Sequence, residues 1–140
     1  MVFNFIDPTS GEMIVRLILA AILGGIVGIE RELTHKPAGL RTHMLVSIGA
    51  ALFTITSLVN FVATDSARIV ANIVVGIGFI GGGSIVALRG RVHGITTAAS
   101  LWIVAALGFA AGMGSYIIAI AATIIVFLIL QLKKYEKTLE

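Results

Sequence analysis

The sequence predicts an all-α, polytopic membrane protein with about five transmembrane helices. Of its 140 residues, 58% are hydrophobic and 12% are charged, and the mean hydropathy is +1.07. A soluble domain of this size carries about a quarter of its residues as charged side chains. The apolar residues form runs long enough to cross a hydrocarbon core, which takes about 20 helical residues. We therefore expect residues 1–140 to form a single transmembrane domain.

Five apolar runs are separated by short polar connections. They cover residues 13–29, 44–62, 69–88, 95–112 and 116–132. The first run follows Asp7-Pro8-Thr9-Ser10, which is typical of a helix start, and no Lys or Arg precedes it. A cleaved signal peptide needs a basic segment before its apolar run, so we expect this run to stay in the protein as a span. The short connections predict antiparallel neighbouring helices.

The basic residues are divided unequally between the two sides of such a bundle. With five alternating spans, one side receives Arg31, Lys36, Arg41, Arg89, Arg91, Lys133, Lys134 and Lys137. The other side receives only Arg16 and Arg68. Because cytoplasmic loops are enriched in Lys and Arg, we expect the N-terminus outside and the C-terminus in the cytoplasm. Membrane topology thus explains the basic excess, and no nucleic-acid partner is expected.

Glycines recur at helical spacing within the apolar runs. Three pairs lie four residues apart: Gly24 and Gly28, Gly78 and Gly82, and Gly108 and Gly112. In lipid, helices approach closely where small residues remove the side-chain barrier. We expect these faces to receive neighbouring helices, and they are compatible with a homo-oligomer, of which a dimer is favoured.

The triple glycine Gly81-Gly82-Gly83 lies in the inner half of the third run. Each glycine costs a helix about 1 kcal/mol relative to alanine. One interpretation is a helix break that lines a cavity, as at many ion or substrate sites. The other is tight packing alone, and the sequence leaves both open.

Two loops on the predicted cytoplasmic side hold polar candidates. The first loop contains Glu30, Arg31, Lys36, Gly39, Arg41, Thr42 and His43. It is either a charged interfacial loop or a surface that contacts an ion, a ligand or a partner. Its carboxylates and histidines (Glu30, Glu32, His35 and His43) have no fixed metal-ligand spacing, so no metal site is predicted. The second loop leads through Thr96 and Thr97 into the fourth run, where Trp102 is interpreted as a packing residue.

On the outer side, Asp65 and Arg68 are three residues apart, which makes them neighbours at a helix start. Asn72 lies one turn deeper, and it faces either another helix or a cavity. Arg16 lies near the outer end of the first run, where it either extends to the interface or pairs with Asp65 or Glu12. Because the chain has no cysteine and its histidines are expected on the side opposite Asp65, we expect neither an enzyme nor a cofactor.

Three stretches resemble the MgtC/SapB family of bacterial membrane proteins. They are GGIVGIER at 24–31, continuing to KPAGLRTH at 36–43; DSAR at 65–68 with NIVVGIGFIGGG at 72–83; and GITTAASLW at 94–102. The family usually has Gln where Asn72 stands. Many members also carry a soluble C-terminal domain similar to an ACT fold, and this sequence is expected to correspond to the transmembrane part.

The resemblance implies a helical inner-membrane protein linked to growth in low magnesium and, in pathogens, to survival inside macrophages. It also implies two mechanisms: modulation of other membrane proteins, including the ATP synthase, or magnesium transport. A transport path would use the third helix, Asn72, Asp65 and the loop 30–43. Since every ionisable residue is expected near a membrane boundary, the sequence favours the modulator.

Overall fold

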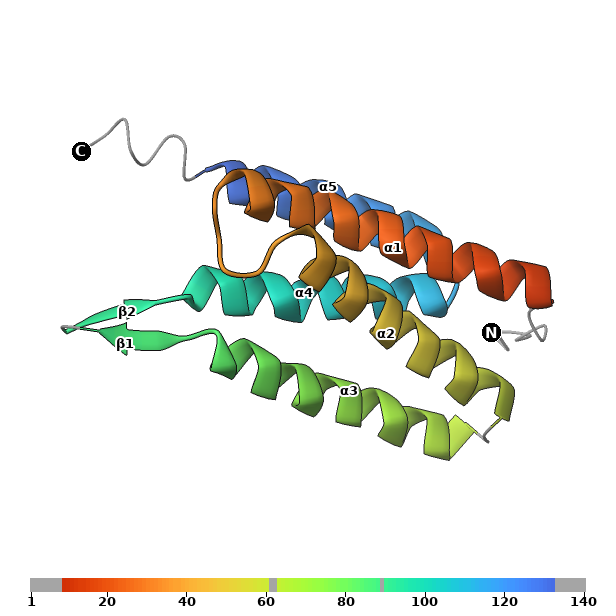
Figure 1. Ribbon diagram of the computed structural model, residues 1–140. Coiled ribbons are helices and arrows are strands. Elements are labelled where there is room, and N and C mark those ends of the chain that lie inside the picture. Colours follow the sequence, from red (N-terminus) through yellow and green to blue (C-terminus); the bar gives the residue numbers. More distant parts are fainter. Residues whose placement is uncertain (1–8, 61–62, 89, 133–140) are drawn as a thin grey trace.

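The computed structural model describes residues 9–60, 63–88 and 90–132 (Figure 1). These residues form α1 (Ser10–Leu33), α2 (Leu40–Asn60), α3 (Ala63–Gly83), β1 (Val86–Leu88), β2 (Arg91–His93), α4 (Ile95–Gly112) and α5 (Tyr116–Gln131). Within this part of the chain, α1, α2 and α4 are long and apolar enough to cross a membrane, and α3 and α5 contain shorter apolar helices. The predicted helical membrane fold is confirmed, with a small β-hairpin added.

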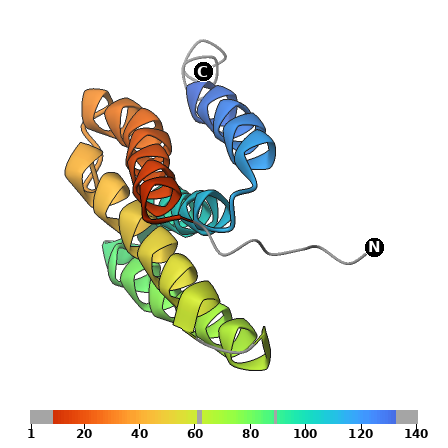
Figure 2. The same cartoon turned by 90° about the vertical axis from the view of Figure 1, so that its right-hand side faces the viewer.

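The centre of the bundle is formed by α1, α2 and α4, which all contact one another. Helix α3 packs on α2 and α4 on one side, and α5 packs on α1 and α4 on the other, as the end-on view shows (Figure 2). The buried core is rich in small residues, including Ala20, Ala51, Ala105 and Ala111. Small side chains let helix backbones approach closely, which is the main source of packing energy in lipid. The outward faces carry exposed Ile, Leu, Val and Phe side chains that suit a lipid environment.

The helix boundaries follow from local chemistry. The Thr9 hydroxyl accepts the backbone N–H of Glu12 at 3.4 Å and caps the start of α1. The carboxylate of Glu32 accepts the N–H of Leu40 at 3.0 Å, so α2 begins four residues before the predicted span at Met44. This bond satisfies one of the donors that a helix start leaves free.

The third predicted span, residues 69–88, differs from the structure. Helix α3 begins earlier, at Ala63, and ends at Gly83, so the triple glycine terminates the helix. Val86–Leu88 instead forms β1, which pairs antiparallel with β2. Glycines lower helix propensity, and the following residues are β-formers that pair across a two-residue turn containing Gly90, whose φ is +76°. The chain then enters α4 through Gly94, whose φ of +90° favours glycine.

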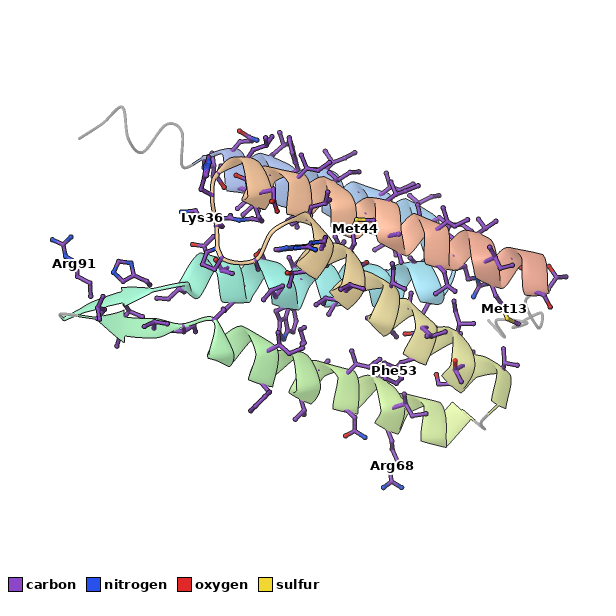
Figure 3. All side chains as sticks on the ribbon, viewed as in Figure 1. Met13, Lys36, Met44, Phe53, Arg68 and Arg91 are labelled. Atoms are coloured by element: carbon purple, nitrogen blue, oxygen red, sulfur yellow. The ribbon has the colours of Figure 1, made fainter. Side chains whose placement is uncertain are left out.

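The two ends of the bundle carry different charged residues. Figure 3 places Lys36 and Arg91 at the end that holds the α1–α2 loop and the hairpin, and Arg68 near the opposite end. The C-terminal end of α5 lies at the first of these ends (Figure 1). Helix direction therefore alternates as the sequence predicts. The basic residues 133–137 of the predicted tail lie outside the described residues.

Candidate functional site

The structure gathers buried polar side chains where α1, α2 and α4 meet. His43 is fully buried on α2, and its ring nitrogens lie 2.9 Å from the Gly39 carbonyl and 3.0 Å from the Ser100 hydroxyl on α4. A carbonyl only accepts, so Nδ1 carries a hydrogen and donates it to Gly39. The Ser100 hydroxyl also donates to the Thr97 carbonyl at 2.8 Å. When His43 is neutral, its Nε2 and the Thr97 carbonyl compete for the single hydrogen of the Ser100 hydroxyl. When the ring is doubly protonated, Nε2 donates to the Ser100 oxygen, and the hydroxyl can donate to Thr97 at the same time.

Two of the predicted packing glycines hold α1 against this part of α2. A Cβ atom on Gly24 would lie 2.7 Å from both the His43 carbonyl oxygen and the Ser47 Cβ. One on Gly28 would lie 2.8 Å from the Leu40 Cα and 3.0 Å from the His43 Cβ. Real Cβ atoms do not approach so closely. The turn of α2 that contains His43 can therefore pack against α1 only because Gly24 and Gly28 have no side chain.

The other two packing glycines bring α4 against α2. A Cβ on Gly108 would lie 2.8 Å and 2.9 Å from the backbone carbon atoms of Ser47. One on Gly112 would lie 2.9 Å from both the Ala51 carbonyl oxygen and the Thr54 Cβ. The backbone of α2 is therefore in close contact with α1 near Gly24 and Gly28 and with α4 near Gly108 and Gly112, and the space between the helices is closed at these positions.

The charged pair Glu30–Arg31 lies in the last turn of α1, beside this cluster. These side chains belong to residues that are only 5% and 2% exposed, and Arg31 Nη1 lies 3.4 Å from Glu30 Oε2. Among the described residues, Arg31 Nε and Glu30 Oε2 have no hydrogen-bond partner. Removing one member of a buried pair leaves an uncompensated charge, which costs far more than losing an exposed pair.

The remaining loop candidates have structural contacts or face outward. The Glu32 carboxylate that caps α2 occupies the space that a Cβ on Gly39 would need. Arg41 is exposed, whereas Lys36 and Thr42 are half-buried. Across residues 9–60, 63–88 and 90–132, no three His, Asp or Glu side chains gather as metal ligands would. The acidic and histidine residues of this loop therefore do not form one centre.

A second polar cluster lies at the opposite end of the bundle. Arg16 is buried, donates to the Gly112 carbonyl at 2.7 Å and pairs with Glu12 at 2.6 Å. The Tyr116 hydroxyl donates to the same Glu12 carboxylate at 3.3 Å. Of the two partners expected for Arg16, the structure thus gives Glu12; the Asp65 side chain, with its predicted pairing to Arg68, lies outside the described side chains. The cluster ties the start of α1 to the α4–α5 turn.

A groove lies between α2 and α3, with a volume of about 550 Å³. Its walls are almost entirely apolar, and Phe53 lies on α2 beside α3 (Figure 3). Asn72, an exposed residue, is among those that line the groove, and it contributes an amide to the lining. Gly49 and Gly76 also line the groove, and a Cβ on either would meet no atom within 4 Å. The groove is therefore open and apolar, and it runs along the outside of the bundle between α2 and α3.

The sequence candidates on α3 and α4 are dispersed. A Cβ on Gly78, Gly82 or Gly83 would meet nothing within 4 Å, whereas one on Gly81 would make ordinary contact with Ala98. At the start of α4, Thr96 is exposed and Thr97 is buried. Trp102 is half exposed and lines a small apolar pocket against α3.

Several buried hydroxyls escaped the sequence analysis. Ser47, Thr54 and Ser57 are all at most 1% exposed and face the same side of α2. The signal was their spacing of seven and three residues inside an apolar run, which places them on one helix face. Thr54 and Ser57 donate to carbonyls of their own helix at 2.7 Å and 2.8 Å, whereas the buried Ser47 hydroxyl has no hydrogen-bond partner among the described residues.

Comparison with known proteins identifies the family. Residues 17–138 match the model of the MgtC family. The chain is 43% identical over 130 residues to the putative magnesium transporter YhiD of Escherichia coli, covering 87% of this chain and 60% of that protein. It is 45% identical over 114 residues to protein MgtC of Salmonella typhimurium, covering 81% of this chain and 48% of that protein.

An uncharacterized protein of Synechocystis is 44% identical over 115 residues, which cover 82% of this chain and 49% of that protein. The chain thus spans about half to three fifths of the length of these relatives. None of the solved structures matches it. The family model covers residues 17–138, which include most of α1 and all of α2, α3, α4 and α5. The chain therefore belongs to the MgtC family.

Proposed function

We propose that this protein is a non-enzymatic, multi-pass inner-membrane protein that modulates a partner membrane complex during adaptation to low magnesium. The name of the Escherichia coli relative supplies the link to magnesium. The observation that carries the proposal is the open groove between α2 and α3, whose apolar walls suit the side chains of a transmembrane helix. Asn72 within it offers an amide to such a helix.

The closed interior argues against conduction through a single chain. Backbone contacts at Gly24, Gly108 and Gly112 leave no room for even one added carbon between the central helices. A cation path needs a series of oxygen ligands or charged groups facing a wet cavity. In the described part of the chain, the buried charged residues lie instead at the two ends of the bundle: Glu30 and Arg31 at one end, and Arg16, which pairs with the partly exposed Glu12, at the other.

The same geometry supports self-association. The face of α3 that carries Gly78 and Gly82 is open, and neighbouring Val75 and Phe79 are strongly exposed. Two copies could approach closely along this face, which supports the expected dimer.

By the positive-inside rule, we place the α1–α2 loop and the hairpin in the cytoplasm.

The alternative is a small magnesium-type cation transporter. The Escherichia coli relative YhiD is named as a putative protein of this kind. One observation favours it: α3 ends at the triple glycine beside a groove that holds the amide of Asn72. A pathway would then form only between copies, where two such grooves face each other.

Purified protein in liposomes distinguishes the two functions. We expect magnesium and monovalent cation flux no greater than in protein-free liposomes. Gradient-driven flux that is lost in Glu30→Ala, Asp65→Ala or Asn72→Ala, and kept in the lipid-facing control Ile118→Ala, would overturn the proposal.

A groove-filling variant tests the modulator directly. Gly76→Leu places a side chain in the groove where the added Cβ meets no atom within 4 Å, so the fold should tolerate it. We expect a strain that carries only this variant to lose growth in low magnesium. Gly78→Leu makes the same change on a neighbouring face of α3, so it tests the α3–α3 contact instead of the groove. Normal growth with Gly76→Leu would contradict a partner in the groove.

A further inference from the structure

The β1–β2 hairpin is exposed on all sides in the described structure. Val86, Leu88 and Val92 are 55%, 60% and 55% exposed, although all three are apolar. The register pairs Val86 with His93, Ala87 with Val92, and Leu88 with Arg91. Opposed residues of an antiparallel pair share a face. One face therefore carries Val86, Leu88, Arg91 and His93, and the other carries Ala87 and Val92.

Both outer edges of the hairpin have open backbone groups. Within the described residues, β1 and β2 form a two-stranded sheet without a further strand. The pair Leu88–Arg91 closes a two-residue turn, and pairs then alternate between hydrogen-bonded and non-hydrogen-bonded types. The backbone N–H and C=O groups of Ala87 and Val92 therefore point outward. An isolated two-stranded hairpin is marginal in water, and its free edges are templates for another strand.

The hairpin projects from the end of the bundle. Figure 1 shows it continuing beyond the ends of the helices, roughly along the direction of α3 and α4. If those helices cross the bilayer, the hairpin stands in the aqueous phase. Its exposed apolar side chains and open edges are then available to a protein partner.

The charge of the hairpin identifies the chemistry of that partner. Arg91 and His93 are exposed on it, and residues 84–94 contain no Asp or Glu. The half-buried Lys36 of the α1–α2 loop lies at the same end of the bundle, as does the exposed Arg41 in the first turn of α2, against the one exposed carboxylate of Glu32 among the described residues there. An approaching segment with acidic side chains is attracted by this end, and a basic one is repelled.

We propose that the β1–β2 hairpin binds an extended acidic segment of an aqueous-phase partner protein, which adds to it as a third strand. The outward-pointing backbone N–H and C=O groups at an edge of the hairpin supply the pairing. Arg91 selects for acidic side chains. The inference deepens the proposed function, because it gives the modulated complex a second contact outside the membrane. It concerns a different surface from the groove, so the liposome flux assay and the experiment below fail independently.

The full chain in nanodiscs of phosphatidylcholine provides the test. Fluorescence anisotropy would compare a labelled peptide of alternating Val and Glu with a peptide of alternating Val and Lys. A third peptide, with Val and Glu but N-methylated at every amide, has no backbone N–H to donate from either edge. We expect the acidic peptide to bind about tenfold more tightly than the basic one, and N-methylation to abolish binding.

Two charge reversals separate the hairpin from the rest of the protein. Arg91→Glu should weaken the acidic peptide by about fivefold or more, in line with the upper range of exposed ion pairs. Arg68→Glu, an exposed arginine near the other end of the bundle, should leave its affinity unchanged. Neither change touches the core, so circular dichroism of both variants should match the parent.

Three results would overturn the inference. Equal binding of the N-methylated peptide would show that no strand is added. Equal affinity of the parent and Arg91→Glu would remove the charge selection. If no peptide binds and hairpin amide exchange slows only when the discs contain phosphatidylglycerol, the hairpin is a lipid anchor instead.

Discussion

A single methyl group at Gly108 should separate α4 from α2. The Cβ of Gly108→Ala would lie 2.8 Å and 2.9 Å from backbone carbon atoms of Ser47, which cannot rotate away as a side chain could. Overpacking a closed contact costs about 1–3 kcal/mol, and we expect the upper end because the obstacle is backbone. Alanine returns up to about 1 kcal/mol through its higher helix propensity. The net loss should be about 2 kcal/mol of unfolding free energy.

Gly76→Ala, on the groove side of α3, is the matched control for this prediction. It makes the same chemical change in α3, where a Cβ meets nothing within 4 Å, so only the propensity gain of up to about 1 kcal/mol remains. The two variants should thus differ by about 3 kcal/mol, or on the order of 100-fold in the unfolding equilibrium constant.

Unfolding in mixed detergent micelles with increasing dodecyl sulfate would measure that difference. Trp102, the single tryptophan, lies on the same helix as Gly108 and reports its environment by fluorescence. Equal midpoints for Gly108→Ala and Gly76→Ala would refute the argument that backbone contact at Gly108 holds the central helices together.

Three further changes follow from the buried contacts. Arg16→Leu should lower the unfolding free energy by about 1.5–3 kcal/mol in the same assay, because it removes the charge-assisted bond to the Gly112 carbonyl; an unchanged midpoint would contradict this. Ser100→Ala should cost about 0.6–1.7 kcal/mol and should lose that effect in a His43→Ala background, and additive losses would show that the two side chains are not coupled. Gly94→Ala should cost at least about 1–2 kcal/mol, because its φ is +90°, and amide exchange in the hairpin should accelerate; unaltered exchange would argue against strain there.

The fold class could be predicted because it depends on length and hydropathy alone. Apolar runs of membrane-spanning length have few alternatives in lipid, where every backbone group must bond internally. The end of α3 was harder to predict. Val86–Leu88 continues an apolar run, and a short apolar stretch does not by itself distinguish helix from strand. The triple glycine marked the position, but the hairpin depends on the turn at Gly90 and on pairing with β2.

The polar contacts could be predicted only in part. Glu12 lies one helical turn from Arg16, so this pair follows from spacing. The other Arg16 bond goes to the carbonyl of Gly112, and a backbone acceptor 96 residues away has no sequence signature. The His43–Ser100 bond depends on how α2 and α4 are aligned, which the glycine contacts set. Residue types alone therefore identified the polar loop but missed its partner on α4.

The arrangement of the chain across the bilayer is best tested by single cysteines, since the sequence contains none of its own. In intact spheroplasts, a membrane-impermeant maleimide should label Arg68→Cys, near the end of the bundle opposite the hairpin. It should label Val92→Cys, in β2, only after the membrane is permeabilised. Labelling of both positions from outside, or of Val92→Cys alone, would contradict a bundle that crosses the membrane with its hairpin in the cytoplasm.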